Sequence, residues 1–192
     1  MSASEAVPRL VLAPADADWH ADAASLAHWA RGVGLAGTPL DDRHLRAGED
    51  FLSLLSFLGC SPTVSFDPPD TAAVGSGLFY HLRVQAFDRP CFRADAMTPA
   101  PRCPECRARL EDWRRWWPAG AEPDPRACPG CGTELTPQRL NWRRSAGVGR
   151  SFIEVLGIHA GTVQPVDALF TRLAEQSGAQ WGYFFVQDAV AR

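Results

Sequence analysis

The stretch Cys103–Cys106 reads C-P-E-C, and after twenty-one further residues the stretch Cys128–Gly132 reads C-P-G-C-G. In each stretch a tight turn can point two cysteine sulfurs in the same direction. Two such turns facing each other would place four thiolates at the corners of a tetrahedron, which suits Zn²⁺ with Zn–S distances of about 2.3 Å. The spacing therefore predicts one metal ion held by four ligands, which are Cys103, Cys106, Cys128 and Cys131.

Residues 101–144, which contain both stretches, resemble a zinc ribbon of the rubredoxin-like type. Gly130 and Gly132 permit the positive-φ turn of a ribbon knuckle in the second stretch. In the first stretch Arg107 stands where such a knuckle usually has glycine. The resemblance implies a scaffold and no particular activity, because zinc ribbons serve many functions. It does not extend to the rest of the chain.

Four thiolates saturate tetrahedral zinc and leave no position for a reactive water, so we expect a structural zinc site. The stretch Cys128–Gly132 is also similar to a rubredoxin knuckle, and one iron ion in the same cage would imply electron transfer. Spacing alone does not choose between these metals. Zinc is favoured because Arg107 replaces the glycine that would complete the rubredoxin pattern in the first stretch.

The composition is that of one globular unit with its own core. The chain has 192 residues, of which 46% are hydrophobic, and a net charge of -3. No apolar run approaches the roughly 18 residues that a membrane helix needs, and the segment after Met1 does not resemble a signal peptide. We therefore expect a cytoplasmic protein without membrane spans, in which cysteine pairs bind metal more often than they form disulfides.

Before the cysteines, the pattern is that of helices followed by strands. The Ala-rich residues 19–31 are expected to form a helix capped by Asp18, and the apolar run 50–58 a second, buried helix. Residues 38–41 resemble a further helix start. Alternating or β-branched residues predict strands over residues 9–12, at an edge of the sheet, 62–67 and 78–87.

Residues 78–87 form the clearest of these strands. Leu82 and Val84 fall on one face and His81 and Arg83 on the other, because successive side chains of a strand alternate. We expect the first face to join the core and the second to be wetter. Residues 88–101 are rich in turn and breaker residues, so the chain should leave the sheet there.

After the cysteines the pattern becomes strand, helix, strand, as in a βαβ unit. Strands are expected over 140–144, 151–158 and 181–186, with a loop over 145–149. A helix should begin at Pro165 and end at Gly178, with a stripe formed by Val166, Leu169, Phe170 and Leu173. The class is α+β, with one mainly antiparallel sheet, helices packed on a face, and a zinc ribbon inserted. Residues 1–100 and 145–192 would form the single α+β domain and residues 101–144 the inserted module.

The inserted module is rich in aromatic and basic side chains. Its tryptophans are Trp113, Trp116, Trp117 and Trp142, and residues 101–150 contain ten arginines against six acidic residues. One interpretation is that the aromatic rings cover a ribbon too small to build its own core, and we favour it. The other is an exposed face, including Arg107, Arg109, Arg114 and Arg115, that stacks on nucleic-acid bases.

Other candidates for chemistry are less specific. His81 and His159 could approach each other with Glu154 nearby, and Cys60 and Cys91 have the apolar neighbours of buried thiols. The chain lacks a phosphate-binding loop and the sequence signatures of hydrolases and zinc proteases, so no catalytic residue is predicted. The sequence favours a non-enzymatic zinc protein that binds a protein partner as an adaptor. The alternatives are a nucleic-acid-binding protein that uses the Arg/Trp-rich face, or an enzyme of unknown class.

Overall fold

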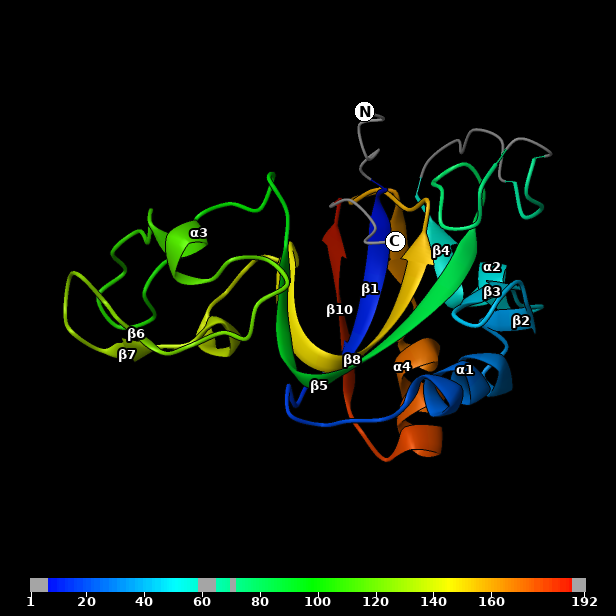
Figure 1. Cartoon of the computed structure of the whole chain (residues 1–192), viewed down its shortest axis with the longest axis horizontal. Coiled ribbons are helices and arrows are strands. Elements are labelled where there is room, and N and C mark those ends of the chain that lie inside the picture. The colour runs from blue at the N-terminus through cyan, green and yellow to red at the C-terminus, as the bar shows by residue number, and fades with distance from the viewer. Residues whose placement is uncertain (1–6, 59–64, 70–71, 188–192) are drawn as a thin grey trace.

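Six strands pair in one antiparallel sheet, whose arrangement is shown in Figure 1. The computed structural model describes residues 7–58, 65–69 and 72–187. In spatial order the strands are β10 (Trp181–Val186), β1 (Arg9–Pro14), β8 (Ala146–Leu156), β5 (His81–Ala94), β3 (His44–Ala47) and β2 (Ala36–Pro39). Every neighbouring pair is antiparallel. The predicted α+β class with a mainly antiparallel sheet is therefore confirmed.

Two helices cover one face of this sheet, and shorter elements complete the fold. They are α1 (Ala23–Gly32) and α4 (Asp167–Ser177). Leu26 of α1 and Leu169 and Leu173 of α4 are fully buried and share one core with Leu82 and Ile153 of the sheet. The remaining elements are α2 (Phe51–Leu54), β4 (Leu55–Phe57), α3 (Trp113–Trp116), β6 (Arg126–Ala127), β7 (Glu134–Leu135), the 3-10 turn η1 (Pro137–Arg139) and β9 (Val163–Pro165).

The strand–helix–strand unit at the end of the chain forms as predicted, but another strand divides it. Strand β1 pairs antiparallel with both β8 and β10, so those two strands are parallel to each other and lie on either side of β1. The prediction of residues 9–12 as an edge strand was wrong. All six residues of β1 are buried, because the strand has a neighbour on each side and packed side chains on each face.

Strands β5 and β8 continue well beyond their predicted ends. They pair over His81–Ala86 with Ser151–Leu156 and again over Cys91–Ala94 with Ala146–Gly149, with a register shift between the two stretches. Residues 88–94 and 146–149 were both predicted as loops, and that prediction was wrong. Such an irregularity bends a strand without ending its pairing, and both strands curve sharply in Figure 1.

The glycines of β8 suggested a loop in the sequence, but Gly147 lies within the strand and is required there for packing. A Cβ atom at Gly147 would collide with the ring of Phe184. The glycine therefore lets the bent strand approach β10 closely. The bend encloses a second set of buried apolar side chains on the sheet face opposite the helices, among them Val11, Phe152 and Phe184.

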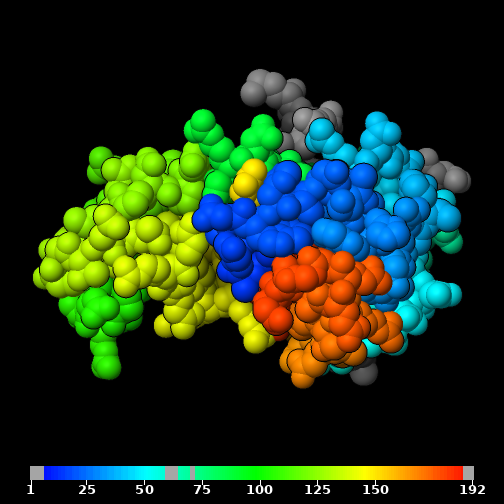
Figure 2. Space-filling view, turned by 90° about the horizontal axis from the view of Figure 1, so that it is seen from below, coloured from blue at the N-terminus to red at the C-terminus, as the bar shows by residue number. Residues whose placement is uncertain are grey.

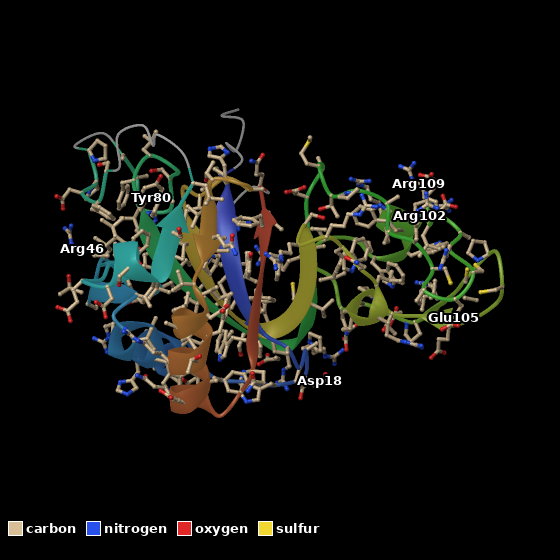
Figure 3. All side chains as sticks on the ribbon, turned by 180° about the vertical axis from the view of Figure 1, so that it is seen from behind. Asp18, Arg46, Tyr80, Arg102, Glu105 and Arg109 are labelled. Atoms are coloured by element: carbon tan, nitrogen blue, oxygen red, sulfur yellow. The ribbon has the colours of Figure 1, made fainter. Side chains whose placement is uncertain are left out.

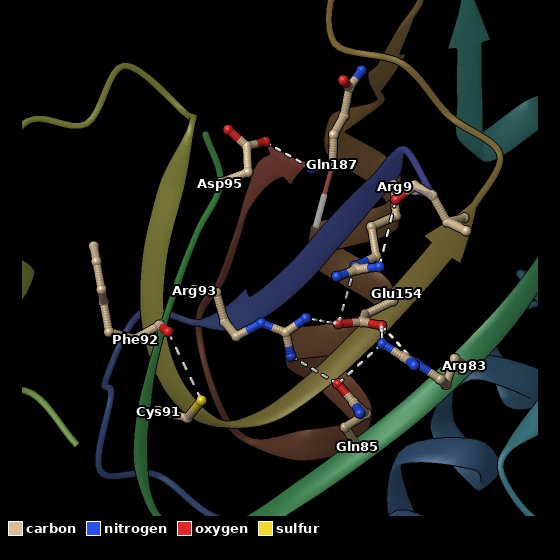
Figure 4. Close-up of polar contacts among 10 residues, drawn as sticks. Arg9, Arg83, Gln85, Cys91, Phe92, Arg93, Asp95, Glu154 and Gln187 are labelled. Atoms are coloured by element: carbon tan, nitrogen blue, oxygen red, sulfur yellow. Dashed lines mark hydrogen bonds and ion pairs between the residues drawn. The ribbon is translucent and has the colours of Figure 1, made fainter. Parts of the chain in front are cut away.

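Glu154 is completely buried on that second face and is surrounded by arginines (Figure 4). Its carboxylate lies 2.6 Å from Nη2 of Arg83, 3.1 Å from Nη2 of Arg93 and 3.6 Å from Nε of Arg9. Burial alone would raise the pKa of Glu154, but the guanidinium groups outweigh burial and lower it. Arg93 also donates to Gln85 at 2.8 Å. Buried charges require such pairing, since transferring them unpaired from water is costly.

The second face of β5 is thus not the wetter face that was predicted. His81 is completely buried and Arg83 is 3% exposed, because the curved β5–β8 pair covers the face. Alternation along a strand shows which residues share a face, but both faces of this sheet are covered. Polar residues on the second face are held in the interior by specific partners.

Several predicted element boundaries also need correction. Helix α1 begins at Ala23, and Asp22 caps it instead of Asp18, accepting the Ser25 N–H at 2.7 Å. The apolar run 50–58 forms only one helical turn before it becomes β4, which pairs with β9. Residues 38–41 enter strand β2 and its turn instead of starting a helix.

The end of the chain needs three similar corrections. Pro165 belongs to β9, and α4 begins two residues later at Asp167. Residues 140–144 form no strand, because Arg143 and Arg144 adopt left-handed backbone conformations. The predicted strand 62–67 lies partly outside the described residues, and residues 65–67 within them form no strand.

Replacing Glu154 with glutamine should lower the free energy of unfolding by about 3 kcal/mol, because the buried arginines would lose their negative partner. Chemical denaturation followed by circular dichroism would measure the change. The matched control is Glu49→Gln at an exposed position, which should stay within about 0.5 kcal/mol of the wild type. Equal stabilities of the two variants would contradict a stabilising role for the buried ion pairs.

Candidate metal centre

The chain between β5 and β8, residues 95–145, is called the inserted segment below. The four cysteine sulfurs predicted to bind metal lie together at one end of it. All four lie within 4.8 Å of one another. The Sγ–Sγ distance is 3.8 Å for Cys103 and Cys131 and 3.6 Å for Cys106 and Cys128. The edge of a tetrahedron with Zn–S bonds of about 2.3 Å is about 3.8 Å. These sulfurs are too far apart for disulfide bonds, which need about 2.05 Å, so the cluster could hold a metal ion.

The two knuckles that carry the sulfurs have the same backbone hydrogen bonds. In the first, the Arg107 N–H donates to the carbonyl of Cys103 at 3.0 Å, and the Cys103 N–H donates to the carbonyl of Ala108 at 2.9 Å. In the second, the Gly132 N–H donates to the carbonyl of Cys128 at 2.8 Å, and the Cys128 N–H donates to the carbonyl of Thr133 at 2.8 Å. Both turns therefore present their cysteines in the same way.

A short antiparallel pairing closes each knuckle. Arg102 and Arg109 form a bridge around the first, and Ala127 pairs with Glu134, through β6 and β7, around the second. Gly130 is also close to the sulfurs, since a Cβ atom there would lie 3.1 Å from Sγ of Cys106. The arrangement agrees with the predicted resemblance to a zinc ribbon in its two matching turns and its sulfur cluster.

Arg107 adopts the left-handed conformation that glycine adopts in the second knuckle. Its φ is 62°, and that of Gly132 is 75°. A side chain at positive φ costs roughly 1 kcal/mol because Cβ crowds the backbone. The departure from the glycine pattern therefore changes the cost of the turn and leaves its shape intact.

The tryptophans of the segment form its core. Trp113, Trp117 and Trp142 are 2%, 1% and 6% exposed. The ring centroid of Trp142 lies 5.1 Å from that of Trp113 and 5.2 Å from that of Phe92 on β5. Trp116 is half-buried against the same cluster. The prediction that these rings cover the ribbon is confirmed, and the rings also attach the segment to the tip of the β5–β8 pair.

Several arginine side chains of the segment donate hydrogen bonds to backbone carbonyls of the same segment. Arg114 lies 4.2 Å from the Trp113 ring centre and donates to the carbonyls of Ala96 and Thr98 at 2.8 and 2.9 Å. Arg102 donates to the carbonyl of Arg107 at 3.0 Å. Figure 3 shows Arg102, Arg109 and Glu105 extending outward from the end of the segment that carries the cysteines. The basic composition therefore reflects structural arginines as well as exposed ones.

The structure gives the residues of the suggested enzymatic site separate partners. His81 is buried, donates from Nδ1 to the carbonyl of Phe79 at 3.1 Å, and accepts the Gly75 N–H at Nε2 at 3.0 Å. His159 hydrogen-bonds Gln187, and Glu154 belongs to the arginine cluster.

The other two cysteines, Cys60 and Cys91, were predicted to be buried thiols. Cys91 is 6% exposed, and burial raises the pKa of its thiol, as expected of a buried and unreactive cysteine. Cys60 lies outside the described residues.

Sequence reasoning overlooked a feature at the other end of the segment. Arg143 and Arg144, with φ of 52° and 61°, form a left-handed turn beside Tyr183 of β10. Two consecutive arginines resemble ordinary surface residues, and Tyr183 is 39 positions away from Arg144. The sequence offered no local signal that would join them.

No protein-family model, curated protein or solved structure matches this chain. Among the described residues, no helix has the length and apolar character needed to cross a membrane.

Exchanging residues at the two equivalent turn positions should have opposite effects. Arg107→Gly relieves the left-handed strain and should stabilise the segment by about 1 kcal/mol, whereas Gly132→Ala introduces it and should destabilise by a similar amount. Thermal unfolding followed by tryptophan fluorescence reports mainly on the segment, because four of the seven tryptophans lie in it. Shifts of the same sign in both variants would contradict the equivalence of the knuckles.

Acid should weaken the fold through His81. Burial lowers its pKa from 6.5 to about 4. Between pH 6.5 and pH 4 the unfolded chain therefore binds a proton at His81 and the folded chain does not. The contribution of His81 to the free energy of unfolding is complete above pH 6.5 and decreases as the pH falls towards 4. The loss should reach about 3 kcal/mol. It is measured as the difference in unfolding free energy between wild type and His81→Asn, which should shrink from pH 7 to pH 4.5. His20→Asn, at an exposed position, is the control, and a His81 difference independent of pH would contradict the argument.

Proposed function

We propose that this chain is a non-enzymatic cytoplasmic protein that binds one structural zinc ion and acts as an adaptor for a protein partner. The observation that carries the proposal is the cluster of four sulfurs on two matching knuckles. Cys103, Cys106, Cys128 and Cys131 are the proposed ligands. Residues 101–144 are the proposed inserted module, and residues 1–100 and 145–192 the domain that carries it.

The donor set supports a structural role for the metal. Four thiolates fill the coordination of tetrahedral zinc, so the ion would cross-link the two knuckles and leave no position for substrate. Iron in the same cage is the alternative. Zinc is favoured because Arg107 stands in the first knuckle where the rubredoxin pattern has glycine.

A protein partner is favoured over nucleic acid by the burial of the aromatic rings. Binding of single strands usually depends on exposed aromatic side chains on which bases stack. Trp113, Trp117 and Trp142 are buried in the segment's core, where their rings pack in tilted and edge-on contacts with one another and with Phe92. Arg114 is also occupied by backbone carbonyls. Of the four tryptophans only Trp116 is half-buried, so the segment exposes many charged side chains and little aromatic surface.

The purified protein should contain one zinc per chain, measured by elemental analysis, and should be colourless. Cys128→Ser should lose the zinc and disorder mainly residues 101–144, because the two knuckles would no longer be cross-linked. Hydrogen exchange measured by mass spectrometry would locate the loss of protection. The β1, β8 and β10 pairing, which has its own apolar core, should remain protected.

Cys91→Ser is the matched control, since Cys91 lies outside the sulfur cluster and should leave the zinc content unchanged. Metal-free protein with residues 101–144 fully protected would contradict the zinc proposal, and a red, iron-containing protein would replace zinc with iron. The adaptor role is tested with the same variants as bait in the native host. Wild type and Cys91→Ser should retain a protein partner that Cys128→Ser loses, and retention of nucleic acid alone would contradict the adaptor role.

A further inference from the structure

A cleft of about 270 Å³ lies where the end of the inserted segment meets the sheet. Its lining includes Gln138, Asn141, Arg143 and Arg144 from the segment and Tyr183 from β10. The segment after β1 forms the opposite wall. Figure 2 shows a face on which the end of the inserted segment borders this N-terminal segment. The cleft exists only because the inserted segment and the sheet are held together.

The backbone at the cleft is strained and held in place by specific bonds. Arg143 and Arg144 both have positive φ, a conformation in which Cβ crowds the backbone. The Asn141 carboxamide oxygen accepts the Arg143 N–H at 2.9 Å, and the Arg144 carbonyl accepts the Phe185 N–H at 2.9 Å. Strained residues that a fold retains are found preferentially at functional sites. The strained turn places two adjacent arginines in the lining of one cleft.

The two arginines are presented differently. Arg144 lies over the Tyr183 ring, 4.4 Å from its centre, and donates to the Tyr183 hydroxyl, so its guanidinium has a fixed orientation. Arg143 is exposed, and within the described part of the chain its guanidinium has no acidic partner. A guanidinium binds a carboxylate through two parallel hydrogen bonds. The pair can therefore receive acidic groups from another molecule.

Strand β10 adds a backbone edge beside the arginines. Among the strands of the described residues its neighbour is β1 alone, so its other edge faces away from the sheet. On that edge the Phe185 N–H bonds Arg144 and the Gln187 N–H bonds the Asp95 carboxylate at 2.7 Å. By alternation the backbone of Tyr183 points to the same edge. A Cβ atom on Gly182, which is half-buried, would meet no atom of the described residues within 4 Å.

Charge indicates which partner suits the cleft. Residues 101–150 carry ten arginines and six acidic residues, whereas the remainder carries nine arginines and sixteen acidic residues. Arg143 and Arg144 line one wall of the cleft, whereas the exposed Asp16 and Asp18 adjoin Ala15 and Ala17 of the opposite wall, so acidic groups of a partner would face the arginine wall. Complementary charge guides partners to such a surface and selects among them.

We propose that this cleft binds an extended acidic segment of a partner protein. Arg143 and Arg144 would pair with its carboxylates, and the free edge at Tyr183 would pair with its backbone, as when a peptide adds a strand to a sheet. The inference rests on the proposed protein-binding function and assigns its binding surface. In this proposal the role of the zinc ion would be to stabilise the segment that contains both arginines.

The test uses a fluorescein-labelled decapeptide of alternating glutamate and tyrosine, with binding followed by fluorescence anisotropy. The double variant Arg143→Asn, Arg144→Asn removes both guanidinium groups and keeps residues that tolerate positive φ. Its affinity for the peptide should fall at least tenfold, while its melting temperature stays unchanged or rises. The matched control is Arg115→Asn, Arg126→Asn, which removes two exposed arginines of the same segment away from the cleft and should change affinity less than twofold.

Three results would overturn the cleft proposal. They are no binding of the peptide by wild type, an equal loss of affinity in both double variants, and tighter binding of a thymidine decamer than of the peptide. Zinc content and hydrogen exchange measured on the same samples separate this proposal from the proposed function. One zinc per chain with no peptide binding would overturn the cleft alone, whereas a folded, zinc-free segment would overturn the zinc scaffold.

Discussion

The long, bent pairing of β5 with β8 is the constraint on which the rest of the structure depends. The two strands pair in two antiparallel stretches with a register shift between them. One stretch lies in the six-stranded sheet, and the other extends to the inserted segment, which follows β5 and precedes β8. Phe92 on β5 anchors the tryptophan cluster, and Gly147 on β8 lets the bend close against Phe184. Without the bend, the segment would have no apolar surface to rest on.

The same bend explains why polar residues occur in the interior. Once β5 and β8 curve over the second face of the sheet, any charge on that face leaves water and needs a partner. Glu154 meets this need for Arg83, and His81 uses both ring nitrogens on backbone groups of the loop before β5. Two residues of the suggested enzymatic site, Glu154 and His81, therefore hold structural positions.

The inserted segment combines a rigid interior with two contrasting ends. At one end, four sulfurs on matching turns could be cross-linked by a metal. At the other, the turn at Arg143 and Arg144 is bonded to the edge of β10. The buried tryptophans lie between these ends and pack against Phe92 of β5.

The sequence by itself determined the cysteine cluster, the antiparallel α+β class, helix α4 and strand β10, because each depends on local spacing or on a short apolar period. It did not reveal the continuation of β5 and β8, since Pro90 and Gly147 have the local character of a loop, and only pairing between distant strands overrides it. The cleft was equally hidden. Arg144 and Tyr183 are joined by the way the segment packs on the sheet, and such long-range contacts leave no periodic signal in a single sequence. Local spacing thus specified the cluster of four sulfurs, and tertiary packing alone decided what lies beside it.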